Sequence, residues 1–330
     1  MVQLVKPILN LENLKMYFPV RGGVFRRQVG RVYAVDDVSL RIQAGHTLGL
    51  VGESGCGKTT LGRSVLQLYK PTSGTVHFDG LDLVKMRRKN LLSVRRDMQM
   101  IFQDPYESLN SRHTIGTILE EPFVIHRIGN ASKRKDMVQQ ILERVGLSRD
   151  ALSRYPHEFS GGQRQRIGIA RAIALNPKLV ICDEPVSALD VSIQSQILNL
   201  LLELQRELHL SYLFIAHDLA VVKHISDYIA VMYLGKIMEY APAEELYDKP
   251  THPYTRALIE AIPVPDPGVR KGFKPLGGDV ASPVNPPSGC RFHTRCPHAI
   301  DDCRREEPEL IQRGDSKEGH LSACIRVGDI

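Results

Sequence analysis

The chain has 330 residues, a hydrophobic content of 42% and a formal net charge of +6. This length allows one large domain with an extension, and the apolar content is sufficient for a core. No apolar run approaches the about 18–20 residues of a membrane-spanning helix, and the first residues lack the apolar core of a signal peptide. We therefore expect a protein that is cytosolic or peripheral on the cytosolic face of a membrane.

The positive charge is partly gathered in short clusters, such as Arg95 with Arg96. Clustered cations can bind nucleic acid, but no aromatic-rich or zinc-finger-like module accompanies them. We therefore expect solvated surface and no nucleic-acid partner. The charge is also compatible with anionic lipid heads nearby.

Strand and helix patterns alternate along the chain. Residues 8–18 and 32–42 alternate like strands, and the Gly- and Arg-containing residues 19–30 between them predict a hairpin or loop. Further strands are expected at 46–51, 75–78, 98–102, 178–182 and 212–216, and helices at Leu61–Leu68, 114–145, Gly162–Leu175, 192–209 and 252–262. This alternation indicates an α/β fold with a mainly parallel sheet.

The run from Gly52 to Thr60 fits the phosphate-binding pattern G-x-x-x-x-G-K-[ST]. Its glycines let the backbone N–H groups face phosphates, and the helix that follows adds its positive dipole end. Lys58 can reach the β- and γ-phosphates, and the Thr59 hydroxyl can hold Mg²⁺. The residues predicted to bind nucleotide are Gly52, Ser54, Gly55, Cys56, Gly57, Lys58, Thr59 and Thr60.

An acidic pair, Asp183 and Glu184, follows the apolar run Leu179–Cys182. A carboxylate at Asp183 can hold Mg²⁺ directly or through water, and Glu184 can polarise an attacking water as general base. The alternative is a surface Asp-Glu pair in front of a proline turn.

Six motifs in this order resemble the ATP-binding-cassette (ABC) family. They are the P-loop, a Q-loop glutamine at Gln103, the signature Phe159–Arg166, the acidic pair, the run Ser187–Asp190 and a switch histidine at His217. The resemblance covers residues from about 8 to 240. It implies a P-loop NTPase with a RecA-like core, an antiparallel β subdomain and an inserted α-helical subdomain.

The same resemblance implies the domain organisation. We expect the ATPase core at residues 1–104 and 166–240 and the helical signature subdomain at 105–165. Residues 241–330 then form a C-terminal extension that is rich in Pro and contains four cysteines.

The family's functional roles fall on matching residues of this chain. The resemblance makes Glu184 the catalytic base, places the Gln103 amide near Mg²⁺ and water, and lets His217 sense the γ-phosphate. The signature residues Ser160, Gly161, Gly162 and Gln163 are expected to close over the ATP held by a second subunit. One copy of the chain then cannot complete a site.

An aromatic side chain near the N-terminus should stack on the adenine. Tyr33 is the first choice, with Tyr17 and Phe18 as rivals, because the insertion before Tyr33 blurs the register. Core packing explains each of these rings equally well.

The tail is similar to the C-terminal region of oligopeptide and dipeptide importer ATPases. The matching runs are Thr251–Leu258, Ser282–Cys290 and Arg295–Pro297, and the likeness is greatest to the F-type subunit of dipeptide importers. This implies ATP-driven peptide uptake, with a D-type ATPase as head-to-tail partner, two permeases and an extracytoplasmic binding protein. The subunit would be peripheral on the cytoplasmic face of the bacterial inner membrane. The sequence does not exclude a second copy of this chain as the partner in place of the D-type ATPase.

Four cysteines of the tail, at positions 290, 296, 303 and 324, have the spacing C-x₅-C-x₆-C-x₂₀-C. Common zinc ribbons use C-x₂-C instead, and disulfides are rare in a reducing cytosol. Four thiolates suit a [4Fe–4S] cluster, which importer ATPases of this type carry. Zinc, with His293 or His320 replacing a thiolate, and no metal at all are the alternatives.

Two other functions stay open at this point. One is a soluble ABC ATPase of DNA repair or of ribosomes, although the tail and the single cassette argue against it. The other is an importer with a different cargo, such as a nickel chelate, haem or another small solute. A subunit that touches the permease does not identify the cargo.

Overall fold

The computed structural model describes residues 6–25, 27–262, 277–312 and 319–329. Pro263, Pro265, Pro267 and Pro275 of the Pro-rich tail lie outside the described residues. The contacts divide the chain into two compact units. Unit 1 comprises Met1–Ile8, Ile42–His46 and Lys85–Ile215, and unit 2 comprises Leu9–Arg41, Thr47–Val84 and Ala216–Ile330.

Unit 1 is built on three parallel strands. β6 (Met98–Ile101) pairs with β7 (Leu179–Asp183), and β7 pairs with β8 (Ser211–Ala216). Every residue of β7 and β8 is buried. Continuous apolar runs of this kind are typical of parallel strands that are covered on both faces, as the sequence predicted.

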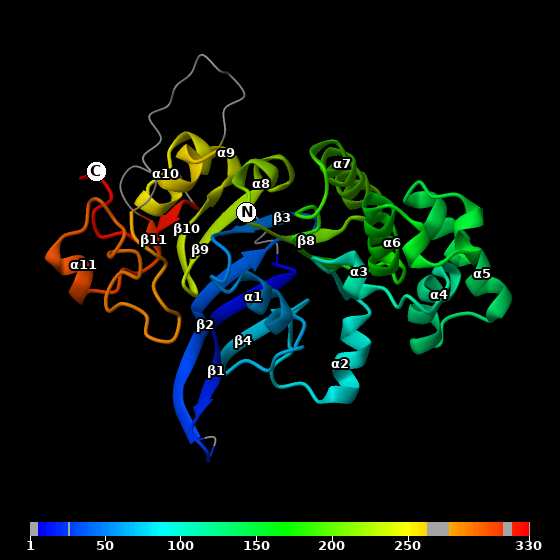
Figure 1. Ribbon diagram of the computed structural model, residues 1–330, viewed down its shortest axis with the longest axis horizontal. Coiled ribbons are helices and arrows are strands. Elements are labelled where there is room, and N and C mark those ends of the chain that lie inside the picture. The colour runs from blue at the N-terminus through cyan, green and yellow to red at the C-terminus, as the bar shows by residue number, and fades with distance from the viewer. Residues whose placement is uncertain (1–5, 26, 263–276, 313–318, 330) are drawn as a thin grey trace. The chain divides into compact units, whose positions relative to one another are not determined.

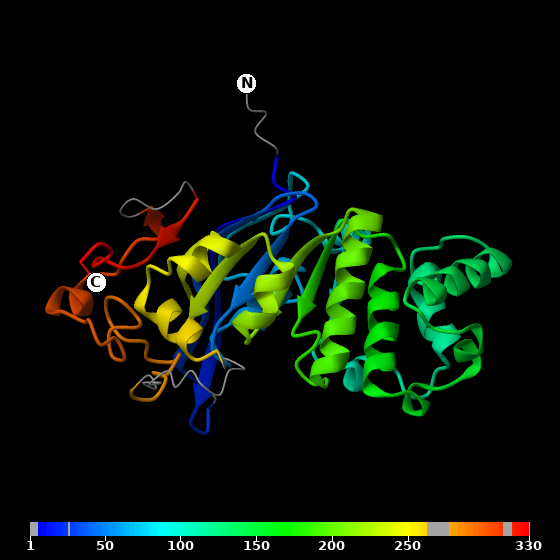
Figure 2. The same ribbon diagram turned by 90° about the horizontal axis from the view of Figure 1, so that it is seen from above.

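Helices accompany these strands in unit 1 (Figure 1). They are α2 (Arg88–Arg95), α3 (Pro105–Ser108), α4 (Ile115–Ile125), α5 (Ala131–Arg144), α6 (Gly161–Ile173) and α7 (Val191–Leu208), with 3₁₀ turns η1 (Arg149–Ser153) and η2 (Pro156–Glu158). Figure 2 shows α6 and α7 running side by side.

The helical stretch expected at 114–145 is two helices. Arg127 and Gly129 both adopt positive φ, at 56° and 65°, which ends α4. Asn130 then caps α5 by accepting a hydrogen bond from the Lys133 N–H at 2.9 Å. Asn is a preferred N-cap residue. Asn130 therefore marks the start of a second helix, although the apolar pattern of residues 114–145 resembles one continuous helix.

Unit 2 begins with an antiparallel sheet of strand order β2-β1-β4-β5. Its strands are β1 (Leu9–Gly22), β2 (Arg27–Ile42), β4 (Ser73–Phe78) and β5 (Leu81–Asp82). β1 and β2 extend through the predicted insertion as one long hairpin (Figure 1). The insertion is therefore mostly strand, and its tip exposes Val24 and Phe25.

A second sheet of unit 2 carries the P-loop. β3 (Thr47–Val51) runs parallel to β9 (Tyr228–Tyr233), which pairs antiparallel with β10 (Lys236–Pro242). β10 also pairs with β12 (Leu321–Ser322), and β12 with β11 (Ile311–Gln312). The end of the chain thus adds strands to this sheet, which the sequence did not predict.

Short helices complete unit 2. They are α1 (Lys58–Val65), α8 (Leu219–Ile225), α9 (Ala243–Asp248), α10 (Pro253–Glu260) and α11 (Asp301–Arg305). Among the residues that the structure describes, no helix has both the length and the apolar character needed to cross a bilayer.

Candidate functional site

The P-loop connects β3 to α1, and its shape depends on glycine. Gly55 and Gly57 have φ of 78° and 110°, a region that residues with a side chain rarely adopt. A Cβ at Gly52 would lie 2.0 Å from the Met232 carbonyl oxygen, and one at Gly57 would lie 1.9 Å from that of Ala34. Steric packing therefore requires glycine at 52 and 57.

Lys58, the first residue of α1, is buried below the loop. Its ammonium donates hydrogen bonds to the carbonyl oxygens of Gly52 at 2.7 Å and Glu53 at 3.1 Å. It also lies 3.8 Å from the sulfur of Cys56. Burial raises the pKa of the Cys56 thiol, which therefore stays protonated and weakly reactive.

The remaining predicted P-loop residues lie in and beside the same turn. Ser54 is part of the loop, and Thr59 and Thr60 follow Lys58 in the first turn of α1. All three are at least partly exposed.

The acidic pair ends β7 in unit 1. Asp183 is buried, whereas Glu184 turns out of the strand with a φ of 47° in front of Pro185. A non-glycine residue at such a φ costs about 1–3 kcal/mol and persists where the surroundings enforce it. The Glu184 N–H donates to the Ile215 carbonyl at 2.9 Å, which holds the turn.

Gln103 meets this carboxylate within unit 1. Its side-chain amide donates to Glu184 Oε2 at 3.1 Å across 81 residues of sequence. The structure therefore brings two of the three predicted catalytic side chains together. The third, His217, is an exposed residue of unit 2 between β8 and α8.

The signature residues form the N-terminus of α6. Ser160 Oγ accepts from the Gln163 N–H at 3.3 Å, and Gln163 Oε1 accepts from the Ser160 N–H at 3.0 Å, which is a reciprocal capping box. Gly161 is the first residue of α6. A Cβ at Gly162 would lie 2.6 Å from Ile193 Cγ2, so this glycine lets α6 approach α7.

The rings considered for adenine lie along the β1–β2 hairpin. Tyr33 packs edge-on against Tyr17, with ring centroids 4.8 Å apart. The Tyr17 hydroxyl is bonded to Asp36, and Phe18 packs against Tyr69. Tyr17 and Phe18 thus have packing roles of their own, and adenine stacking on Tyr33 stays a prediction.

The four cysteines of the tail line one cavity of about 20 Å³ in unit 2. All four are reduced cysteines that are not joined in disulfides. Burial, with the nearby thiols of Cys324, Cys303 and Cys296, raises the pKa of Cys290 to about 12. Within the described part of the chain, no group of three or more His, Cys, Asp or Glu side chains is arranged to hold a single metal ion.

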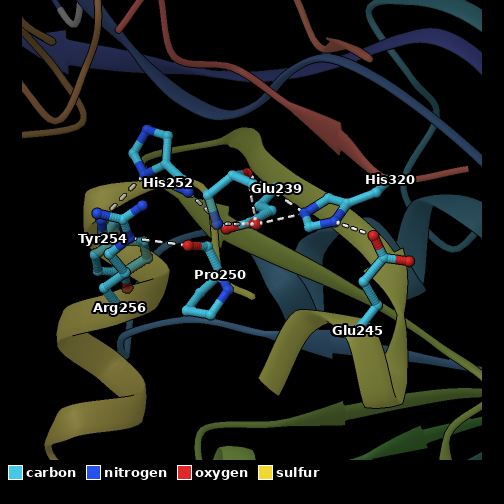
Figure 3. Close-up of polar contacts among 8 residues, drawn as sticks. Glu239, Glu245, Pro250, His252, Tyr254, Arg256 and His320 are labelled. Carbon is cyan, nitrogen blue, oxygen red and sulfur yellow. Dashed lines mark hydrogen bonds and ion pairs between the residues drawn. The ribbon is translucent and has the colours of Figure 1, made fainter. Parts of the chain in front are cut away.

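The two histidines considered as alternative ligands differ. His293 lines the cysteine cavity. His320 instead lies between two carboxylates, with Nε2 2.7 Å from Glu239 Oε1 and Nδ1 3.1 Å from Glu245 Oε1 (Figure 3). Burial alone would lower the pKa of His320, but the hydrogen bonds to Glu239 and Glu245 raise it.

Glu239 is the centre of this polar cluster, and sequence reasoning missed it. It is fully buried in β10 and accepts hydrogen bonds from the N–H groups of Thr251 and His252 and from the Thr251 hydroxyl (Figure 3). Burial alone would raise the pKa of Glu239, but its hydrogen bonds, led by the one from His320, lower it. A charged residue within an apolar strand was the available signal.

Comparisons with known proteins identify the family of the chain. The ABC transporter family model matches residues 35–187, and the model of the oligopeptide/dipeptide transporter C-terminal region matches residues 238–303. The oligopeptide transport ATP-binding protein AppF of Bacillus subtilis is 54% identical over 320 residues, 96% of each chain. A probable peptide ABC transporter ATP-binding protein of Sinorhizobium fredii is 53% identical over 96% of this chain and 89% of its own.

Solved structures show the same core. The dimeric ATP-binding cassette MJ0796 bound to ADP and phosphate superposes with a TM-score of 0.64 at 27% identity, over 71% of this chain and 98% of its own. CbiO1 of Clostridium perfringens, part of an ABC transporter complex, also reaches 0.64, at 26% identity over 74% of this chain and 91% of its own. The chain therefore belongs to the ABC transporter ATP-binding proteins, in the group with the oligopeptide/dipeptide transporter C-terminal region.

Proposed function

We propose that this chain is the ATP-hydrolysing subunit of a membrane importer for dipeptides or oligopeptides. One observation carries the proposal: a single chain matches both the ABC core and the peptide-transporter C-terminal region, and its relatives over nearly full length are peptide transport proteins. The relatives favour this function over a soluble ABC ATPase or an importer of nickel or haem.

The chemistry is divided among a few side chains. Lys58 binds the β- and γ-phosphates, and Glu184 polarises the attacking water while the Gln103 amide orients its carboxylate, as their hydrogen bond supports. Thr59, Gln103 and Asp183 would hold Mg²⁺, whose charge would stabilise the phosphates when bound. His217 senses the γ-phosphate.

The subunit is proposed to work as one half of a head-to-tail pair. Ser160 to Gln163 form a helix N-terminus, which favours anions, and would grip the ATP bound by the partner subunit. The partner would be a D-type ATPase or a second copy. Two permeases and an extracytoplasmic binding protein would complete the importer, with this chain peripheral on the cytoplasmic face of the bacterial inner membrane.

The proposed domains follow the family pattern. The ATPase core would comprise residues 1–104 and 166–240, and the helical subdomain residues 105–165. The extension, residues 241–330, would be a Pro-rich module that is organised by its four cysteines.

We infer a [4Fe–4S] cluster at Cys290, Cys296, Cys303 and Cys324. The four thiols share one cavity, and burial raises the pKa of Cys290 and of Cys296, so these two need a cationic centre in order to act as thiolates. Zn²⁺, which thiolates bind at about 2.3 Å, is the alternative occupant of the same four cysteines.

Cys296→Ser tests this centre. Anaerobically purified wild-type protein should be brown and contain about four irons per chain, and the variant should lose both colour and iron. Iron analysis and visible absorption measure this, with Cys182→Ser, a buried cysteine of β7, as control. One zinc per chain and no visible absorption in protein kept from oxygen would replace the cluster with a zinc site.

Peptide uptake by the assembled importer in proteoliposomes tests the function. Glu184→Gln, with the partner's own site inactivated, should keep ATP binding but lower turnover and peptide uptake by at least about a hundredfold, because it removes the general base. Wild-type turnover in this variant would refute the role of Glu184. A complex that hydrolyses ATP but imports no dipeptide, tripeptide or pentapeptide would refute the cargo.

A further inference from the structure

The C-terminal segment (residues 241–330) contacts the P-loop at Glu53. The Tyr254 hydroxyl, in the first turn of α10, accepts a hydrogen bond from the Glu53 N–H at 3.0 Å. The Arg295 guanidinium donates to both carboxylate oxygens of Glu53, at 2.7 and 3.1 Å. Glu53 occupies one of the four unspecified positions of the P-loop pattern, and 242 residues separate it from Arg295.

The ion pair solves an electrostatic problem in the loop. Glu53 adds a negative charge to a turn whose task is to bind phosphates, and like charges at short range repel. The Arg295 side chain is only 7% exposed and that of Glu53 27%, so water screens this charge poorly. The two-point contact with Arg295 neutralises the carboxylate and fixes its direction.

The backbone of Glu53 is fixed as well. Its N–H is bound by Tyr254, and its carbonyl oxygen accepts a hydrogen bond from the ammonium of Lys58. One residue of the loop is therefore held at three points, two from the C-terminal segment and one from the phosphate-binding lysine. A shift of Tyr254 or Arg295 would move the carbonyl that Lys58 contacts.

Arg295 and Tyr254 have rigid support. Phe292 is fully buried and packs against the rings of Tyr233 and Tyr254, with centroids 5.4 and 5.2 Å away. The Arg295 guanidinium lies 5.9 Å from the Tyr233 ring centroid. Arg291 anchors the same stretch by donating to the Leu234 carbonyl at 2.8 Å and pairing with Asp36. Such support preorganises contacts to a loop.

We propose that Arg295 and Tyr254 are positioning residues for nucleotide binding. Arg295 cancels the charge of Glu53, and both residues hold the first half of the P-loop in its phosphate-binding shape. The C-terminal segment thereby sets the nucleotide affinity of the chain. The inference rests on ATP binding at the P-loop and is independent of the cargo.

The test compares Arg295→Met with the double variant Arg295→Met/Glu53→Met in the full chain. The Kd for a fluorescent ATP analogue with Mg²⁺ should rise at least about tenfold in the single variant, because removing one partner of a poorly exposed pair leaves the other charge uncompensated. Removing Glu53 as well should restore the Kd to within about threefold, since the repulsive charge is then gone. In the assembled importer, the KM for ATP should rise more than kcat falls.

Arg305→Met, at an exposed arginine of α11, is the matched control and should bind like wild type. A purely structural role predicts that the double variant binds no better than Arg295→Met, and that result would overturn the proposal, as would wild-type affinity in Arg295→Met. If thermal melting shows that Arg295→Met is unfolded, the milder variants Arg295→Lys and Tyr254→Phe test the proposal instead. Each should weaken binding about threefold, and wild-type affinity in both would likewise overturn the proposal.

Discussion

Two loops of unit 2 pack against residues 232–235 but are held there by different means. The P-loop, residues 52–57, is shaped by its backbone: Gly52 and Gly57 touch carbonyl oxygens that a Cβ would displace, and the Cys56 carbonyl accepts from the Gly235 N–H. Residues 289–296 are held mainly by side chains, because Arg291 reaches Asp36 and Leu234 and Arg295 reaches Glu53.

The difference decides how each loop can fail. A loop held by backbone contacts cannot accommodate another residue in place of such a glycine. The new Cβ would overlap a backbone carbonyl oxygen, and this overlap cannot be relieved without moving a strand. A loop held by ion pairs can lose one pair and keep the others, since the interactions are separate. The C-terminal segment can therefore tune the P-loop in steps, whereas replacing Gly52 or Gly57 is all or none.

Gly57→Ala should give the largest effect, because it attacks the backbone-held loop. The new Cβ would lie 1.9 Å from the Ala34 oxygen at a φ of 110°. We expect loss of nucleotide binding and a destabilisation of at least about 3 kcal/mol, from steric overlap combined with a strained φ. Nucleotide titration and urea unfolding of the full chain measure both.

Gly45→Ala separates the two causes of that loss. Gly45 also has a positive φ, of 77°, but a Cβ there would meet no atom within 4 Å. Gly45→Ala should lower the free energy of unfolding by only about 1 kcal/mol, because it introduces backbone strain alone. Equal losses of stability in the two variants would show that the strained φ, and not the contact with Ala34, causes the destabilisation in Gly57→Ala.

The sequence predicted what depends on local pattern. The glycines of the P-loop, the strand ending at Asp183 and the helix expected from Gly162 follow from residue types at fixed spacing. Their location on strands and helix starts is therefore confirmed, although the catalytic and binding roles of the individual residues stay predictions.

Long-range side-chain pairs were not predictable. Nothing near Glu53 indicates a partner 242 residues away, and nothing near Glu239 indicates His320, 81 residues further on. The sequence placed His320 among metal ligand candidates because histidine has several roles. Its place between two buried carboxylates is a property of the folded chain. The strands β9 and β10 were not predicted, although both contain the apolar runs of buried strands.

Glu239→Gln should give the second largest effect, because it attacks the side-chain network of the C-terminal segment. Glutamine presents an NH₂ group where Glu239 accepts hydrogen bonds from Thr251, His252 and His320, and it removes the counter-charge of His320. We expect a loss of about 2–4 kcal/mol in the free energy of unfolding, measured by urea denaturation.

Glu244→Gln is the matched control, since Glu244 lies on α9 with an exposed side chain. It should change stability by no more than about 0.5 kcal/mol. P-loop binding of ATP should weaken less in Glu239→Gln than in Gly57→Ala. The reverse order would contradict the distinction between a backbone-held and a side-chain-held loop.

His320 should give the smallest effect, a dependence of stability on pH. The folded pKa of His320 is raised above its ordinary value of about 6.5. Its stabilisation is therefore fully present below about pH 6.5 and is lost as the pH rises through the folded pKa. Two neighbouring groups keep their charge across this window: hydrogen bonds lower the pKa of Glu239, so that it stays ionised, and burial lowers the pKa of His252 to about 4, so that it stays neutral. Wild-type protein should thus lose stability relative to His320→Gln as the pH rises above about 6.5, since the variant lacks this titrating group. The loss should be smaller than that caused by Glu239→Gln, because Glu239→Gln also disturbs the hydrogen bonds from Thr251 and His252. Melting temperatures of both proteins measured across this range provide the comparison, and parallel curves would show that His320 carries no extra proton in the folded chain.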